Sequence, residues 1–95
     1  MKLDADLELQ ILEKVGIYSN RFSIEEPKIL LTTKAVLDSP KEQTEGRRTS
    51  AYKYYGVCYY QHNLVFINVR KTPDEKVLEN TIVHELLHLR FPYLA

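Results

Sequence analysis

A strongly signalled helix near the end of the sequence constrains the fold more than any other feature. The run TPDE at 72–75 has the form of a capping box, with Thr72 as N-cap, Pro73 at the first helical position and Glu75 reaching back to the cap. Pro92 disfavours helical geometry at the preceding residue, so the helix is predicted to run from about 73 to 90. Apolar residues lie on nearly every side of it, which is typical of a buried helix: Val77, Leu78, Ile82, Val83, Leu86, Leu87 and Leu89.

The same helix contains an HExxH motif, formed by His84, Glu85 and His88. Residues four apart on a helix lie about 40° apart in projection, so both imidazoles should face the same way and can reach one Zn²⁺ ion. Glu85 lies about 100° around the helix from His84, where its carboxylate misses the metal but can hold a metal-bound water and accept its proton. The alternative is that both histidines are partly exposed and hydrogen-bonded, with Glu85 on a solvated edge.

The first half of the chain predicts a second helix and the start of a sheet. Apolar residues at helical spacing predict a helix over about 4–15 that stops at Gly16. A strand is expected at 28–33 and one helical turn at 34–37. Residues 39–50 include no large apolar side chain, which is typical of a mobile surface loop.

Two further strands are expected at 51–60 and 64–69, joined by a three-residue hairpin. Within that hairpin, Asn63 is the residue best suited to a left-handed conformation. Gly56 inside the first of these strands indicates a bulge or a close backbone approach. The expected fold is therefore mixed, with helices flanking a small sheet.

The length and composition indicate one small domain spanning residues 1–95. The sequence has 13 basic and 13 acidic residues and is 44% hydrophobic, which argues against disorder. No apolar run approaches the ~18–20 residues that span a bilayer, and the single cysteine, Cys58, cannot form an internal disulfide. We therefore expect a soluble cytoplasmic protein with no membrane association.

The HExxH segment also carries a family resemblance. The run IVHELLHLRFP, preceded by the strand LVFINV and a glycine-bearing strand, resembles the SprT-like and related minimal zincin metallopeptidases over about residues 50–95. This resemblance implies an α+β fold with a small zincin-like core: an N-terminal helix, a three-stranded sheet including a β-hairpin, and a C-terminal HExxH helix. It also implies a zinc-dependent metallopeptidase in which His84 and His88 bind Zn²⁺ and Glu85 is the general base, acting on peptide or protein substrates. Some members cleave proteins crosslinked to DNA, so association with DNA is a further expectation.

The resemblance leaves the third metal ligand open. Those families supply it shortly after the HExxH helix, whereas none of residues 89–95 here is His, Glu, Asp or Cys. A catalytic zinc ion normally has three protein ligands and a water. We therefore expect that this sequence stops short of the third ligand and is inactive in this form. The alternatives are an incomplete site or one that borrows a group from within the chain, for which His62 and Cys58 are the candidates.

The basic residues are unevenly distributed. Between residues 46 and 72 the chain has five basic residues and no acidic one, and five of the seven tyrosines fall at 52–60. Such a segment can neutralise phosphates and stack bases, so a catalytically inactive module binding nucleic acid or a protein partner through Arg47, Arg48 and Lys53 is the rival function. The simpler explanation is that tyrosine favours strands and that lysine on an exposed strand blocks edge pairing.

Overall fold

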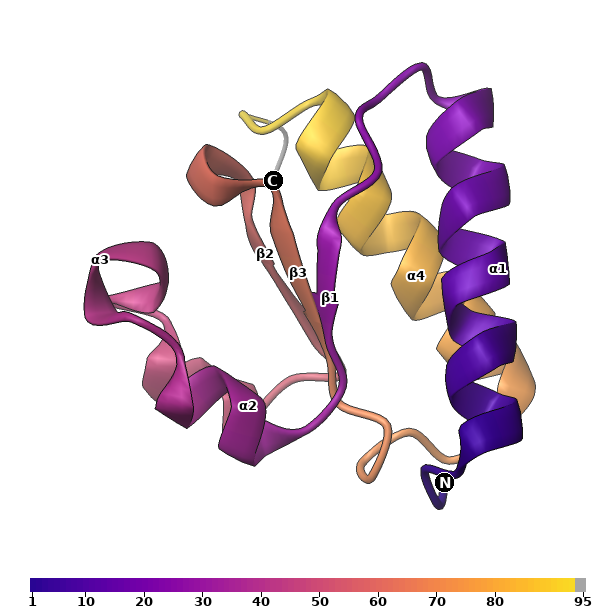
Figure 1. The fold of residues 1–95 in the computed structure, drawn as a ribbon, viewed down its shortest axis with the longest axis horizontal. Coiled ribbons are helices and arrows are strands. Elements are labelled where there is room, and N and C mark those ends of the chain that lie inside the picture. The colour runs from indigo at the N-terminus through magenta and orange to yellow at the C-terminus, as the bar shows by residue number, and fades with distance from the viewer. Residues whose placement is uncertain (94–95) are drawn as a thin grey trace.

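The computed structural model describes residues 1–93. The elements are, in chain order, α1 (Ala5–Arg21), β1 (Lys28–Leu30), α2 (Thr33–Asp38), α3 (Lys41–Thr44), β2 (Gly56–Tyr59), β3 (Leu64–Ile67) and α4 (Glu75–Arg90), with 3₁₀ turns at Arg48–Tyr52 and Tyr60–His62. The strands form one sheet of order β1-β3-β2, in which β1 is parallel to β3 and β2 is antiparallel to it (Figure 1). Four helices and a three-stranded sheet with a hairpin, within residues 1–93, agree with the expected α+β class.

The sheet separates two layers of helices. Helices α1 and α4 cover one face, while α2 and the 3₁₀ turn at 48–52 lie on the other (Figure 1). Val65 and Ile67 of β3 pack with α1 and α4, whereas Leu64 and Phe66 pack on the opposite side. This alternation follows from the two-residue period of a strand, and β3 is buried throughout because both of its faces are covered.

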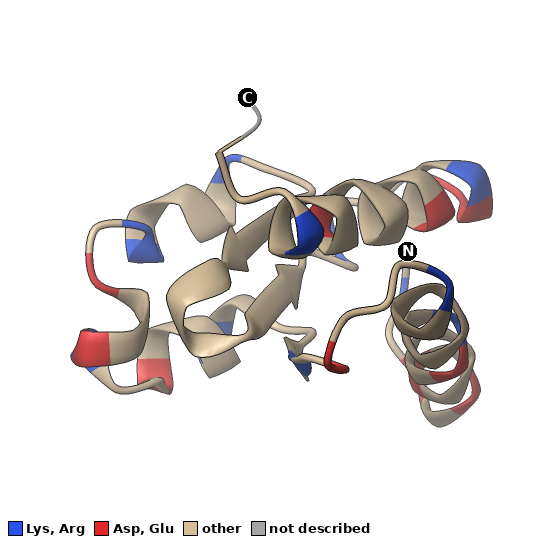
Figure 2. Ribbon diagram, turned by 90° about the horizontal axis from the view of Figure 1, so that it is seen from above, with Lys and Arg blue, Asp and Glu red and all other residues tan. Residues whose placement is uncertain are grey.

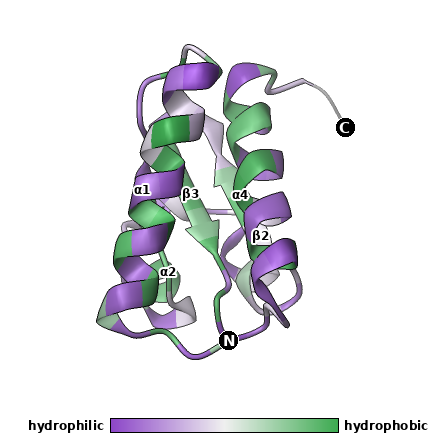
Figure 3. Ribbon diagram, turned by 90° about the vertical axis from the view of Figure 1, so that its right-hand side faces the viewer, coloured by the Kyte–Doolittle hydropathy of each residue, from purple (hydrophilic) through white to green (hydrophobic). Residues whose placement is uncertain are grey.

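Helices α1 and α4 lie side by side (Figure 3). Their apolar faces share one core with the sheet, to which the two helices contribute Leu7, Ile11, Val15, Leu78, Ile82 and Leu86. A polar contact joins the helices at the edge of this core: the Tyr18 hydroxyl donates to Glu79 Oε1 at 2.7 Å, and Lys14 Nζ lies 3.9 Å from Glu79 Oε2. The site-bearing helix is thus held against both the sheet and α1.

Helix α1 continues past the expected stop at Gly16 and ends at Arg21. Its actual end is a Schellman motif, with Ser23 at φ 55°, the Ile24 amide donating to Ser19 O and the Ser23 amide donating to Asn20 O. A glycine inside a helix costs only about 1 kcal/mol relative to alanine, and packing of the following turn against the core offsets that cost. The prediction of a stop at Gly16 was therefore wrong because tertiary packing overrode a local signal.

Helix α4 begins two residues later than the capping box predicted. Asp74 is the N-cap, and its Oδ1 accepts the Val77 amide at 2.9 Å. Thr72 is instead buried, and its hydroxyl donates to Asn68 O at 2.8 Å, which ties the preceding loop together. Both residues can cap a helix, and the fold uses the threonine elsewhere. The end at Arg90 agrees with the prediction.

The region between β1 and β2 differs most from the expectation. In place of a featureless loop over 39–50, the chain forms α3 and part of a 3₁₀ turn, with Thr44 fully buried. Residues 51–55 are not strand: Ala51 is fully buried, and its carbonyl accepts a hydrogen bond of 2.8 Å from Asn68 Nδ2. These contacts join residues distant in sequence, so periodicity alone does not reveal them.

The hairpin agrees with the prediction in its left-handed Asn63, although its loop has four residues, 60–63, in place of three and its strands are shorter. Asn63 has the left-handed φ of 48°, and its side-chain amide donates to the carbonyls of Glu25 and Glu26. Strand β3 ends at Ile67 and not at residue 69, because Asn68 turns the chain and accepts the Lys71 amide on its Oδ1. Strand β1 likewise ends at Leu30, since Thr32 caps α2 by accepting the Ala35 amide at 3.1 Å.

Charged residues lie mainly on the outer surface. Those of α4 are concentrated in its first turns and are few in the half that carries the HExxH motif (Figure 2). Among the helices of residues 1–93, none has the length and hydropathy required to cross a membrane.

Candidate metal centre and its cleft

The two motif histidines face one another across one turn of α4. Their Nε2 atoms are 3.0 Å apart, and the ring centroids are 4.5 Å apart with nearly perpendicular planes. His84 is exposed and His88 is partly buried. The shared direction of the two imidazoles agrees with the four-residue spacing. The contact between them is a hydrogen bond when one Nε2 carries a proton and the other does not.

Glu85 is buried, with only 4% of the residue exposed. Burial raises the pKa of its carboxyl from the ordinary 4.5 to about 7, because the charged form loses solvation, and Arg47 partly opposes this shift. The alternative of a solvated Glu85 is therefore wrong. A carboxyl group with a pKa near neutrality can accept and return a proton under ordinary conditions.

These three residues form a compact group of metal-ligating atoms. One ligand atom each from His84, Glu85 and His88 lies within 4.8 Å of the other two. Two nitrogen ligands at 2.0–2.1 Å from a tetrahedral ion are about 3.3 Å apart, so the observed Nε2 separation of 3.0 Å needs only a small adjustment to hold one ion. The donor set and its geometry therefore fit a metal ion.

Gly56 brings β2 into close contact with this part of α4. A Cβ atom at Gly56 would lie 2.9 Å from Glu85 Cγ, 2.9 Å from Thr81 Cγ2 and 3.1 Å from Phe66 O. Real Cβ atoms essentially never approach other atoms at 2.9 Å. The close approach predicted at this glycine is confirmed, and its effect is to place the edge of the sheet directly over the Glu85 side chain.

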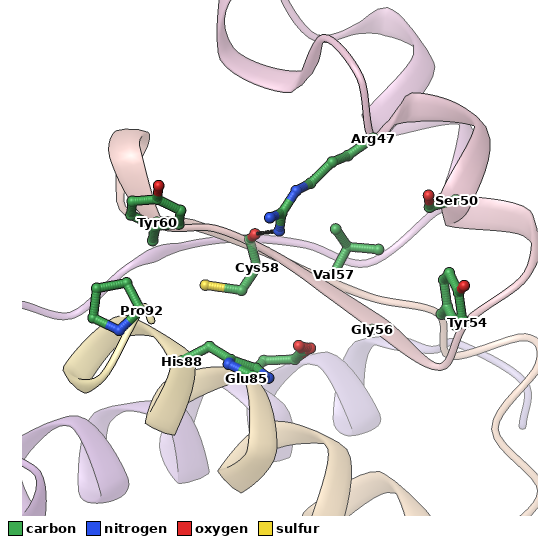
Figure 4. A pocket seen from close by; sticks show the side chains of 10 residues that line it. All are labelled: Arg47, Ser50, Tyr54, Gly56, Val57, Cys58, Tyr60, Glu85, His88 and Pro92. Carbon is green, nitrogen blue, oxygen red and sulfur yellow. Dashed lines mark hydrogen bonds between the residues drawn. The ribbon is translucent and has the colours of Figure 1, made fainter. Parts of the chain in front are cut away.

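A cleft of about 320 Å³ opens between β2 and the C-terminal half of α4 (Figure 4). Its walls include Glu85 and His88 on one side, Cys58 and Tyr60 on the sheet side, and Pro92 at one end. Arg47 reaches over β2 from the segment before the 3₁₀ turn, and its guanidinium donates to the Cys58 carbonyl. Ser50 and Tyr54 complete this second wall. A second hollow of about 330 Å³ also borders Gly56 and is lined by His84 and again by Glu85.

The two internal candidates for a third ligand lie in different places. Cys58 is buried and lines the cleft, and its side chain points from β2 toward α4 (Figure 4). Burial raises the pKa of this thiol to about 12, and the Glu85 charge adds to the effect, so it is protonated at neutral pH. His62 is exposed and lines a separate hollow beside Glu42 and Glu45. Within residues 1–93, neither joins the close group of His84, Glu85 and His88.

The three basic residues assigned to nucleic acid or partner binding are not equivalent. Arg47 is exposed and lines the cleft, Arg48 is partly buried, and Lys53 is exposed directly after the 3₁₀ turn. Of the nearby tyrosines, Tyr59 is buried, whereas the others are exposed: Tyr52, Tyr54, Tyr55 and Tyr60. The role of Arg47 in the cleft was missed because nothing in its local sequence links it to α4.

Comparison of the chain with family models, with curated proteins and with solved structures finds no match. The site is therefore interpreted from its own geometry and chemistry.

Proposed function

We propose that this protein is a zinc-dependent metallopeptidase of the SprT-like type, built on a small zincin-like core. One observation carries the proposal: two histidine Nε2 atoms lie 3.0 Å apart beside a buried carboxyl group whose pKa is about 7, and that carboxyl group lines a cleft of about 320 Å³. This pairing of nitrogen ligands with an adjacent base is the arrangement that hydrolysis of a peptide bond requires.

In this proposal His84 and His88 hold the metal and Glu85 handles the proton. A bound Zn²⁺ ion would lower the pKa of water, which makes hydrolysis feasible at neutral pH. Glu85 lies between the two hollows and, once deprotonated, accepts the proton of the attacking water and passes it to the leaving amine. Its burial excludes competing solvent from the carboxylate.

The sheet edge offers a place for the peptide backbone. In the strand order β1-β3-β2, the outer side of β2 has no strand partner within residues 1–93, and this side borders the cleft. An extended peptide can add to such an edge through main-chain hydrogen bonds. The carbonyl of Cys58 already accepts a hydrogen bond on this side, from Arg47. A substrate strand would therefore lie across Arg47 and in front of Glu85.

The proposal is tested in protein expressed from its complete natural reading frame. Glu85→Gln should retain bound zinc and lose peptide hydrolysis, because the amide keeps the shape of the side chain but cannot accept the proton. His84→Ala should lower the zinc content measured by atomic absorption. Equal zinc content in the wild type and the His84→Ala/His88→Ala variant would remove the metal site, and full hydrolysis by Glu85→Gln would remove the assigned base.

A second function, binding of single-stranded nucleic acid, is favoured by one feature. Tyr52, Tyr54 and Tyr55 are exposed in the same segment as Arg48 and Lys53, so aromatic and cationic groups are available together. Affinity for a single-stranded DNA oligonucleotide should then fall with rising salt and fall further in Arg48→Ala/Lys53→Ala. Binding that is absent at low salt would leave these tyrosines without a role in nucleic-acid recognition.

A further inference from the structure

Arg47 is an exposed residue that lines the cleft, and within residues 1–93 no carboxylate forms a direct ion pair with it. The ion pairs found within residues 1–93 join Lys14 to Glu79 and Lys34 to Asp38, and neither involves Arg47. Its guanidinium donates to one backbone carbonyl, that of Cys58, and lines the same cleft as Glu85 and His88. A bound metal ion would add more positive charge to this cleft. The charge of Arg47 acts on Glu85 at longer range, and Glu42 and Glu45 share a second hollow with it, but none of these carboxylates forms a direct ion pair with the guanidinium.

The remaining donors of Arg47 suit a carboxylate. A guanidinium has five N–H groups in a planar fork that matches a carboxylate with two parallel hydrogen bonds. Within residues 1–93, no carboxylate lies close enough to Arg47 to take up these donors in an ion pair. Ser50 and Tyr60 line the same cleft and carry hydroxyl groups. An incoming carboxylate would thus meet complementary charge and hydrogen-bond donors.

We propose that Arg47 is a specificity-determining residue that binds a carboxylate of the peptide lying in the cleft between β2 and α4. This inference rests on the proposed function and deepens it by naming the substrate class, a peptide with a carboxylate beside the bond placed at Glu85. The carboxylate comes either from an acidic side chain or from the peptide's C-terminus. Arg47 also covers the Cys58 carbonyl, so the same side chain both selects the peptide and borders the sheet edge along which it lies.

The experiment measures binding and does not depend on turnover. Zinc-loaded Glu85→Gln protein is titrated into three fluorescent alanine-based peptides of equal length, and the anisotropy is recorded. The first contains an internal Glu and a C-terminal amide, the second replaces Glu by Gln, and the third has Gln and a free C-terminal carboxylate. Comparison of the first and third with the second shows which source of carboxylate the cleft prefers.

The first or third peptide should bind about tenfold more tightly than the Gln amide, because hydrogen bonds to a charged group are stronger than those to a neutral one. Adding Arg47→Ala should remove this preference while leaving the Gln amide nearly unaffected. Arg47→Lys should retain part of it, since the charge remains without the fork. The matched control, Arg48→Ala, changes a neighbouring arginine that does not line the cleft and should retain the preference.

Equal affinities for all three peptides, or undetectable binding of all three, would overturn the proposal. An equal loss of affinity for every peptide in both Arg47→Ala and Arg47→Lys would also overturn it, because that result would mean that the side chain has a structural role. The proposed peptidase activity fails separately: a carboxylate preference that depends on Arg47, in a protein whose wild type hydrolyses none of the peptides, would support a peptide-binding cleft without catalysis.

Discussion

The two walls of the cleft are built in different ways. The α4 wall presents Glu85 and His88, and His84 lies one helical turn before His88, so the relative positions of the three residues follow from helix geometry. The opposite wall presents Arg47, Ser50 and Tyr54 from an irregular segment, whose position depends on contacts with remote residues. A local motif therefore supplies the metal-ligating groups, whereas tertiary packing supplies the groups that would meet a substrate.

The two walls also differ in the energetic role of their charged residue. Burial of Glu85 destabilises its charged form and therefore raises the pKa of its carboxyl. The positive charge of the Arg47 guanidinium, which lies in the cleft, lowers the same pKa. Residues retained at functional positions often reduce stability in this way. The following predictions separate the two walls by measuring stability and metal binding.

The largest expected effect is on the metal-free protein at pH 8. Below about pH 4.5 the Glu85 carboxyl is protonated in both the folded and unfolded states, while between 4.5 and about 7 only the unfolded chain loses the proton. The free energy of unfolding should therefore fall by about 3 kcal/mol across this range and then become level. Glu85→Gln should be more stable than the wild type at pH 8 and should lose this part of the pH dependence, measured by urea unfolding with chelator present. An unchanged pH profile in Glu85→Gln would contradict the assigned burial.

The second prediction tests whether all protein ligands of the metal come from α4. Zinc at about 100 times its dissociation constant should raise the free energy of unfolding by about 2.7 kcal/mol. His84→Ala/His88→Ala should abolish the shift in thermal melting, whereas Arg47→Ala and His62→Ala should retain it. Loss of the shift in His62→Ala, or in Cys58→Ser, would show that the hairpin contributes a ligand.

Gly56 is the point at which the two sides of the cleft meet. Gly56→Ala should destabilise the protein by about 2 kcal/mol, because the new methyl group meets Thr81, Glu85 and a backbone carbonyl that cannot move freely. The same change should displace Glu85 and reduce hydrolysis more than zinc binding. Chemical denaturation and zinc titration of this one variant measure both effects, and a stability equal to that of the wild type would mean that β2 moves away without cost.

Gly16 provides the matched control and the smallest effect. An alanine Cβ there also lies 2.9 Å from another atom, but that atom is Glu26 Oε1, at the end of a flexible and exposed side chain. Since the position is inside α1, Gly16→Ala should stabilise the protein by less than about 1 kcal/mol through helix propensity. Destabilisation comparable to that of Gly56→Ala would show that the Glu26 carboxylate is held in place.

Local signals in the sequence were sufficient for some elements and insufficient for others. The α+β class, the end of α4 at Arg90 and the left-handed Asn63 each agree with the structure, because each depends on residues adjacent in sequence. The same reasoning placed the end of α1 at Gly16 and the cap of α4 at Thr72, and both were wrong. For α4 a second suitable cap, Asp74, was present nearby. For α1, packing carried the helix past Gly16 to an end closed by Ser23, a residue type that seldom adopts the left-handed conformation.

The features of the candidate site can also be separated into those that local sequence determines and those that depend on tertiary structure. The sequence by itself determined that His84 and His88 lie on one face of α4, since a four-residue spacing makes two side chains neighbours on a helix surface. Only the tertiary structure decided that Glu85 is buried, that Cys58 lines the cleft and His62 does not, and that Arg47 faces α4. The physical reason is the range of the interactions: helix periodicity acts over one turn, whereas burial and electrostatic environment depend on which distant segments the fold brings together.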